Sequence, residues 1–362
     1  MRITRIEVQE LHIGLKKPFI TALRRVDEVN DIIIKIHTDT AYIGYGEACA
    51  VTAITGTTNE DILRELQDEL IPFLLGRELK EYRIFPQLHK LNACAETKAC
   101  VDIALYDIFA KEASLSLHEY LGAKKSSLQT DLTISVNEPL IMKEESQKAI
   151  DLDFDILKIK LDANVGKNIQ RLDAINSIIP SHIRLRLDPN QALNLEECLQ
   201  MLSQINIKNI ECIEQPFKAD DIISMKTLKD KNIISVLADE SLFTLQDAKI
   251  LLDKDAMDFL NIKLMKCGGI FEALKISSLA KEYKKSCMIG SMLEGPISLL
   301  AAAHFGLSQD NITMADLDSP LYLKEHPLLE PFHLKKDTIN LSSKPGLGID
   351  DIMLGLQTFP VQ

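Results

Sequence analysis

Charged residues recur in this chain at nearly regular intervals, each at or just after a short apolar run. The series consists of Lys158, Asp188, Glu214, Asp239, Lys263 and Asp316, at intervals of 30, 26, 25, 24 and 53 residues. One strand, one helix and two loops occupy about 25 to 30 residues, so this spacing indicates a repeated strand–helix unit. Because barrel enzymes carry their chemistry at the carboxyl ends of their strands, we expect these side chains to share one site.

Three of these residues are acids that end consecutive predicted strands: Asp188, Glu214 and Asp239. Neighbouring strands lie about 4.8 Å apart, so the three carboxylates would converge and repel one another. A divalent cation would relieve the repulsion, and ligation by oxygen alone favours Mg²⁺ or Mn²⁺ over Zn²⁺. The alternative is an ion-paired cluster without metal, in which the partners are Lys158, Lys160 and Arg186.

Lysines make up the second part of the pattern. In the segment DILKIKL, side chains alternate between faces, so Lys158 and Lys160 would point together into the barrel mouth. The alternative is a solvated strand end with two surface lysines. Lys263 ends the sixth predicted strand, across the barrel from Lys160. Lys266 is the rival candidate, but its face parity differs and it precedes two glycines, so it is interpreted as a loop residue.

This arrangement suggests proton transfer next to a carboxylate. One lysine would remove a proton from the carbon beside a metal-held carboxylate, and the other would return a proton to the opposite face.

A pair of acids, Asp316 and Asp318, ends the eighth predicted strand, and a period of two puts both on one face. They have no cationic partner nearby in the sequence, so they suit a cationic group on a substrate. The alternative is a turn or helix cap before Pro320. Glu294 is a weaker candidate, and Asn190 and Gln215 are polar neighbours of the acidic residues.

Eight strand ends can be counted in this way, and eight parallel strands close a barrel. Thr133 marks the first of them and Ser291 the seventh, and both would line the site. We therefore predict a modified (β/α)7β TIM barrel over residues 126–320. Residues 1–125 are expected to form an α+β capping domain. It would hold strands near residues 3–8, 31–38 and 41–48, a polar flexible segment near 16–25, and amphipathic helices over 59–75 and 96–113. Residues 321–362 are expected to return to that cap.

Composition limits the class of protein. The chain has 362 residues, 46% of them hydrophobic, and a net charge of −12. This acidic balance argues against nucleic acid or an anionic membrane as a partner. The seven scattered cysteines include no C-x-x-C pair, and the alternating N-terminal segment is unlike a signal peptide, so a cytoplasmic location is expected.

The motifs together resemble the enolase superfamily, muconate-lactonising subgroup, over essentially the whole length. The resemblance rests on Lys158-Ile159-Lys160, Asp188-Pro189-Asn190, Glu214-Gln215-Pro216, Asp239-Glu240-Ser241, Ile262-Lys263-Leu264 and the KPGLG segment. Within the subgroup the chain is most similar to dipeptide epimerases of the L-Ala-D/L-Glu type. Three features favour this: the KPFITALR segment that ends at Arg24, the INIKLMKCGG segment, and the Asp316/Asp318 pair.

The resemblance implies a role for each residue. Asp188, Glu214 and Asp239 would bind one Mg²⁺, and Lys160 and Lys263 would be the two acid/base residues of a 1,1-proton transfer through a metal-stabilised enolate. Lys158 would assist electrostatically, Asp316 and Asp318 would grip the ammonium of a dipeptide, and Arg24 would meet the acidic side chain of its second residue. The reaction would be interconversion of L-Ala-L-Glu and L-Ala-D-Glu in peptidoglycan peptide metabolism, in an expected homo-oligomer.

Two departures from the family pattern, Pro189 and Gly295, leave a broader dipeptide range open. The alternatives are an o-succinylbenzoate synthase or cycloisomerase of the same subgroup and, more distantly, a non-catalytic binding barrel.

Overall fold

The structure is a computed structural model that describes residues 1–362 except 23, 124, 325–327, 329, 351–356 and 361–362. Its larger part is a sheet of eight parallel strands in consecutive order, which confirms the predicted barrel. The strands are β5 (Leu132–Ile134), β6 (Ile156–Lys160), β7 (Arg184–Asp188), β8 (Ile210–Glu214), β9 (Ser235–Ala238), β10 (Phe259–Ile262), β11 (Ser286–Gly290) and β12 (Ile312–Asp316).

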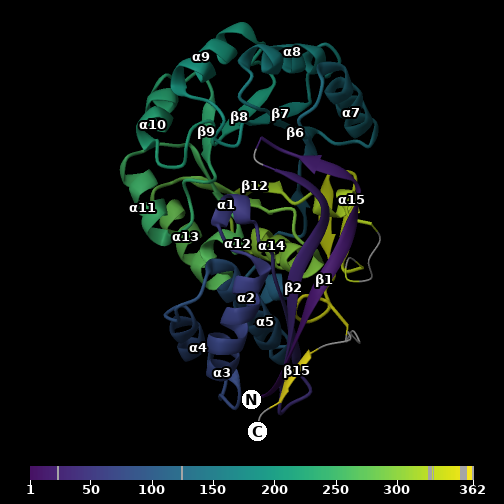
Figure 1. Ribbon diagram of the computed structural model, residues 1–362, viewed down its shortest axis with the longest axis vertical. Helices are drawn as coiled ribbons and strands as arrows, with labels where there is room; N and C mark the ends of the chain where they lie inside the picture. Colours follow the sequence, from purple (N-terminus) through teal and green to yellow (C-terminus); the bar gives the residue numbers. More distant parts are fainter. Residues whose placement is uncertain (23, 124, 325–327, 329, 351–356, 361–362) are drawn as a thin grey trace.

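Helices follow the first seven of these strands and cover the outside of the barrel (Figure 1). They are α7 (Pro139–Asp151), α8 (Val165–Asn176), α9 (Leu195–Gln204), α10 (Ile222–Asp230), α11 (Leu245–Asp253), α12 (Leu264–Cys267) with α13 (Ile270–Glu282), and α14 (Pro296–Ser308). Among the described residues, the helix that follows β12 is the four-residue α15 (Ser319–Tyr322), so the barrel consists of seven strand–helix units and a final strand, as predicted.

A separate antiparallel sheet lies outside the barrel, in the order β15-β1-β2-β3. Its strands are β1 (Ile3–Ile20), β2 (Arg25–Thr38), β3 (Ile43–Ala48) and β15 (Gln357–Pro360). Strand β15 pairs with β1, so the end of the chain returns to this sheet, as expected. Two further short strands, β13 (Phe332–Lys335) and β14 (Thr338–Leu341), instead pair with each other and with β4 (Leu128–Gln129). The three domain ranges remain a prediction.

The expectation of a flexible polar segment near residues 16–25 is wrong. Strands β1 and β2 form one long hairpin that extends from the cap to the barrel (Figure 1), and Ile20 pairs with Arg25 at its tip. Its backbone is also fixed to the barrel, because Ile20 N–H donates to Ser135 Oγ (3.3 Å) and Val136 N–H donates to the Ile20 carbonyl (3.2 Å). The backbone N–H and carbonyl of Ile20 thus both have hydrogen-bond partners in the barrel.

Helices of the cap pack beside the antiparallel sheet. They are α1 (Thr52–Thr55), α2 (Asn59–Glu65) continued by a π-helical turn (Leu66–Leu70) and α3 (Ile71–Leu74), α4 (Glu81–Leu88), α5 (Ala95–Glu112) and α6 (Leu117–Tyr120). Helix α2 is capped by Thr58 and Asp61 in a capping box. The predicted amphipathic character of α5 is wrong, because the helix is buried on nearly every face between the sheet and α12 and α13. Gly46 permits this close approach, since a Cβ there would lie 1.8 Å from the Cys100 carbonyl oxygen.

Two general features bear on the expected setting of the protein. All seven cysteines are free thiols. Over the described residues, none of the helices combines the length and apolar character needed to cross a bilayer.

Buried carboxylates of the cap join it to helix starts in the barrel. Glu47 accepts hydrogen bonds from Ile297 N–H (2.8 Å) and Ser298 N–H (2.9 Å) in the first turn of α14. Asp102 does the same for Ile270 N–H (2.6 Å) at the start of α13. Each acid faces a glycine: a Cβ on Gly295 would lie 2.1 Å from Glu47 Oε1. This contact explains why glycine occupies position 295.

We predict that Gly295→Ala lowers the free energy of unfolding by about 1–3 kcal/mol, because the new methyl group overpacks against Glu47. Gly166→Ala is the matched control, since its nearest neighbour is 3.7 Å away. Urea denaturation monitored by circular dichroism measures both. Equal stability of the two variants would contradict the close contact between Gly295 and Glu47 at the interface of cap and barrel.

Candidate active site

A pocket opens at the carboxyl ends of the barrel strands, with the tip of the β1–β2 hairpin over it. Nine of the residues singled out from the sequence line it: Arg24, Thr133, Lys158, Lys160, Asn190, Lys263, Ser291, Asp316 and Asp318. The acids Asp188, Glu214 and Asp239 are fully or almost fully buried and do not line the pocket. The structure therefore brings the predicted lysines and substrate-binding residues together in one cavity.

Lys158 joins three acids from three different strands. Its Nζ lies 2.7 Å from Glu214 Oε2, 3.0 Å from Asp188 Oδ2 and 2.7 Å from Asp316 Oδ2. The residue is 1% exposed, so the interpretation as a solvated surface lysine is wrong. Asp316, which has no cationic residue nearby in the sequence, is paired by the fold with Lys158, 158 residues away.

Lys160 lies beside Lys158 on the same strand face, as its alternation with leucine and isoleucine predicted. Its Nζ contacts Asp188 Oδ2 (2.6 Å) and donates to Asn190 Oδ1 (3.1 Å). The backbone N–H of Asn190 donates to Asp188 Oδ1 (2.9 Å), and its side-chain Nδ2 donates to Glu240 Oε1 (3.2 Å). Asn190 thus holds both the lysine and its carboxylate partner in place.

Lys263 follows β10, which is four places from β6 in the eight-strand order and so lies across the barrel from Lys160. Its Nζ contacts Asp239 Oδ2 at 2.7 Å. A second lysine, Lys266, contacts the other oxygen of the same carboxylate at 2.5 Å and is 2% exposed. The interpretation of Lys266 as a loop residue is therefore wrong. Helix α12 begins directly after Lys263, so residues three apart share a face where strand parity no longer applies.

The balance between burial and ion pairing shifts the pKa values of these groups. Burial would raise the pKa of Asp188, but Lys158 and Lys160 outweigh it and bring that pKa to about 2. Burial is likewise outweighed at Asp239, where Lys263 and Lys266 lower the pKa. At Glu214 burial dominates over Lys158 and raises the pKa to about 7. The ionised form is therefore more strongly favoured at Asp188 and Asp239 than at Glu214.

The three predicted metal ligands occupy neighbouring strand ends, but their oxygens do not gather as closely as a bound ion requires. Among the described residues, the acids that offer oxygens within 4.8 Å of one another are Asp131, Asp316 and Asp318. Lysines contact the predicted ligands: Lys158 and Lys160 pair with Asp188, and Lys263 pairs with Asp239. Arg186, which the sequence offered as a further partner, pairs instead with Asp131 and Glu211. The donor set nevertheless fits a hard cation. Glu214 Oε2 and Glu240 Oε2 are buried oxygens without a hydrogen bond, although Glu214 Oε2 is within ion-pair distance of Lys158.

Polar residues next to the three predicted metal ligands help to hold them in position. The side-chain oxygen Oε1 of Gln215 accepts from Asp239 N–H (2.9 Å) and Ser241 N–H (3.1 Å), and thus fixes the strand end that carries Asp239. Glu294 is buried outside the pocket lining, and burial together with Glu47 raises its pKa to about 8. The sequence pattern assigned no role to Glu240, although it directly follows Asp239. In the structure Glu240 accepts a hydrogen bond from Asn190, and burial raises its pKa to about 8.

The hairpin tip contributes Arg24 to the pocket. One guanidinium nitrogen donates to the Met292 carbonyl (2.6 Å), and burial lowers the pKa of the group. Phe19 packs edge to face on Tyr322 with ring centroids 5.4 Å apart, and Lys17 pairs with Glu145 at 2.7 Å. These contacts fix the hairpin over the barrel mouth and direct Arg24 at the pocket.

A barrel of seven strand–helix units under an α+β cap, with lysines on opposite walls above buried acids, has the architecture of the enolase superfamily. The description "Enolase C-terminal domain-like" matches residues 141–351, and "Mandelate racemase / muconate lactonizing enzyme, N-terminal domain" matches residues 4–122. The chain belongs to this mandelate racemase/muconate lactonizing enzyme family of the enolase superfamily.

Relatives extend the comparison. The chain is 38% identical to an L-Ala-D/L-Glu epimerase of Clostridium acetobutylicum, over 97% of this chain and 99% of the relative. It is 36% identical to a hydrophobic dipeptide epimerase of Enterococcus faecalis, over 96% and 99%. A substrate-liganded L-Ala-D/L-Glu epimerase of Bacillus subtilis superposes with a TM-score of 0.92 at 36% identity, covering 99% of this chain and 100% of that one.

A dipeptide epimerase of Enterococcus faecalis, solved with Mg and L-Leu-L-Tyr, superposes with a TM-score of 0.90 at 34% identity, covering 97% and 100%. Epimerases and racemases are isomerases, and the chain is an enzyme of that class.

We predict that Lys266→Met lowers the free energy of unfolding by about 3–5 kcal/mol, because it removes one partner of a buried ion pair. Lys249→Met is the control, since Lys249 is exposed and pairs with Asp253 on one helix, a contact worth about 0.5 kcal/mol or less. Guanidinium titration compares the two. A loss at Lys266 no larger than that of the control would show that the residue is not held by Asp239.

Proposed function

We propose that this enzyme epimerises the C-terminal residue of a dipeptide by two-base 1,1-proton transfer, with L-Ala-L-Glu and L-Ala-D-Glu as the principal pair. The observation that carries the proposal is the position of two buried lysines, Lys160 and Lys263. They come from strands on opposite sides of the barrel and both reach one pocket. A carbon held between them would meet an amine on each face.

Proton transfer would follow from this arrangement. One lysine, in its neutral form, would take the α-proton from one face, and the other, as an ammonium, would deliver a proton to the opposite face. The chain holds both lysines rigidly, because each is anchored on a buried carboxylate at the strand end beside it. Anchoring keeps the amines at fixed positions relative to the substrate carbon, which is the main requirement for such transfers.

Asp188, Glu214 and Asp239 would hold one Mg²⁺, with Mn²⁺ able to take its place. When bound, the ion would supply positive charge beside the substrate carboxylate, which makes the adjacent carbon easier to deprotonate. Lys158 bridges Asp188 and Glu214 at 3.0 and 2.7 Å, and we propose that its ammonium also faces that carboxylate.

The other pocket residues would orient the dipeptide. Asp316 and Asp318 would accept hydrogen bonds from its ammonium, and Thr133 and Ser291 would line the backbone between the charged ends. Arg24 would meet the side chain of the second residue. A related o-succinylbenzoate synthase or cycloisomerase would need no acid pair for a substrate ammonium, so Asp316→Asn separates these alternatives from a dipeptide epimerase.

The setting completes the proposal. We propose a cytoplasmic homo-oligomer that acts on peptides from peptidoglycan turnover. The support for the compartment is that all seven cysteines are free thiols, which suits a reducing environment.

Incubation of the enzyme with L-Ala-L-Glu and Mg²⁺ in D₂O should place deuterium on the glutamyl α-carbon and yield the D epimer.

Lys160→Ala and Lys263→Ala should each lower epimerisation by roughly 10²–10⁴-fold, because each removes one acid/base group. Any residual exchange should be confined to one epimer, and to opposite epimers in the two variants. Mass spectrometry and chiral chromatography measure both, with Lys226→Ala as control, since this side chain pairs with Asp230 and is 38% exposed. Full activity in either variant would exclude that lysine from the reaction.

Arg24→Met should lower kcat/KM for L-Ala-L-Glu by roughly 10- to 100-fold, because a charge-assisted hydrogen bond to the glutamyl carboxylate is lost. The loss on L-Ala-L-Ala should be much smaller. Arg25→Met is the matched control, since this neighbouring residue is exposed and pairs with Asp27. Equal losses on both dipeptides would contradict recognition of the side chain by Arg24.

A further inference from the structure

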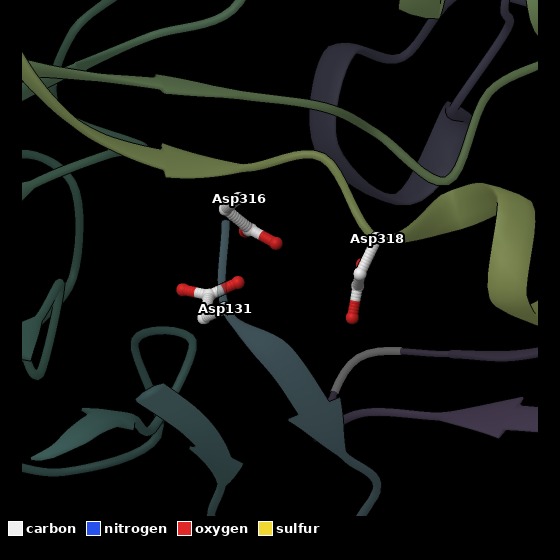
Figure 2. A group of neighbouring side chains, drawn as sticks. All are labelled: Asp131, Asp316 and Asp318. Carbon is white, nitrogen blue, oxygen red and sulfur yellow. The ribbon is translucent and has the colours of Figure 1, made fainter. Parts of the chain in front are cut away.

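Three acids meet where the first and last strands of the barrel approach each other (Figure 2). Asp131 directly precedes β5, Asp316 ends β12, and Asp318 follows two residues later. They offer oxygens that all lie within 4.8 Å of one another, and the residues are 0%, 6% and 4% exposed. The sequence pattern assigned a role to the last two acids but none to Asp131.

Each acid accepts a hydrogen bond from the protein. Asp131 Oδ2 accepts from Arg186 (2.8 Å), Asp316 Oδ2 from Lys158 (2.7 Å), and Asp318 Oδ2 from Thr133 N–H (2.6 Å). The other oxygen of Asp131, Oδ1, is buried and has no hydrogen-bond partner. Figure 2 shows one carboxylate oxygen of Asp131 directed toward Asp316. A buried carboxylate oxygen without a donor is costly, so this position favours an added donor.

Charge points to a cation as that donor. Three carboxylates face two engaged cations, Arg186 and Lys158, and both of these cations also neutralise other acids. Burial and Asp316 raise the pKa of Asp131, and they raise the pKa of Asp318 to about 6. The cations present therefore do not fully stabilise the ionised form of this buried group, and an added monocation would favour it.

Two of the three acids, Asp316 and Asp318, line the pocket, and Asp131 lies behind them with no exposed surface. A cationic group on a substrate in that pocket would therefore reach the three acids from the side of Asp316 and Asp318. A primary ammonium has three N–H donors, one for each acid.

We propose that Asp131 is a substrate-binding residue, the third acceptor for the α-ammonium of the dipeptide beside Asp316 and Asp318. This inference rests on the proposed function, and it narrows the substrate class to dipeptides with a free primary amine. Because the three acids span the junction of β5 and β12, the ammonium would also link the two strands that end the barrel sheet.

The test compares two substrates of similar size in Asp131→Asn. The amide keeps an acceptor for Arg186 but removes the negative charge of Asp131 from the group of three acids. For L-Ala-L-Glu we expect kcat/KM to fall roughly 10- to 100-fold, mostly through KM. For propionyl-L-Glu, which lacks the ammonium, α-proton exchange in D₂O should change less than about threefold, a difference within the range of a surface substitution. Asp107→Asn, a buried acid of the cap, is the control and should affect both substrates equally.

A merely structural role for Asp131 would lower turnover of both substrates together, and that result would overturn the proposal, as would an unchanged KM for L-Ala-L-Glu. Wild-type enzyme gives a second measurement that does not depend on the variant folding. N-methyl-L-Ala-L-Glu has one N–H donor fewer, so its kcat/KM should fall roughly tenfold. Equal values for the two substrates would contradict three acceptors. Failure of the proposed function looks different, because wild-type enzyme would then exchange no dipeptide at all, and this inference would fall with it.

Discussion

The balance of charge inside the barrel mouth is the constraint on which the rest of the structure depends. Four buried lysines stand among buried carboxylates in a space with little water: Lys158, Lys160, Lys263 and Lys266. An unpaired charge in such a place is strongly unfavourable, so every lysine lies against at least one acid. These pairs hold the amines apart on opposite walls. The same lysines contact Asp188, Glu214 and Asp239, the three acids that we propose as metal ligands.

The cap serves this arrangement by covering the mouth and by placing one arginine over it. Its attachment uses buried acids that accept backbone N–H groups at the starts of barrel helices, such as Glu47 at α14 and Asp102 at α13. Glycines opposite those acids leave room for the contact. The long β1–β2 hairpin then extends from the cap to the barrel, and its tip carries Arg24 to the pocket. The position of Arg24 therefore follows from packing far from the pocket itself.

Much of this could be predicted from the sequence because the spacing of strand ends is a local property. The regular intervals gave the number of strands, and alternation in DILKIKL gave the direction of Lys158 and Lys160. Lys266 was misinterpreted because a helix replaces strand geometry directly after Lys263, which changes the face that a residue three positions later occupies. A helix of four residues is too short to produce a recognisable helical pattern in the sequence, so the change from strand to helix after Lys263 could not be predicted.

Contacts between distant residues were beyond the sequence pattern. The partner of Asp316 is Lys158, and no local rule links two residues 158 positions apart. Asp131 looked like the polar residue before a strand, and only closure of the barrel brings it to Asp316 and Asp318. Its partner Arg186 also spans the barrel interior, where it contacts Asp131 and the Ala315 carbonyl. Long-range pairing of this kind is set by the fold as a whole.

A crystal structure with Mg²⁺ and L-Ala-L-Glu bound tests the central claim most directly. The account predicts that the glutamyl α-carbon lies between Lys160 Nζ and Lys263 Nζ, with each nitrogen on its own face of that carbon at about 3–3.5 Å. Both nitrogens on one face of the carbon, or a substrate carboxylate bound away from Asp188, Glu214 and Asp239, would contradict it.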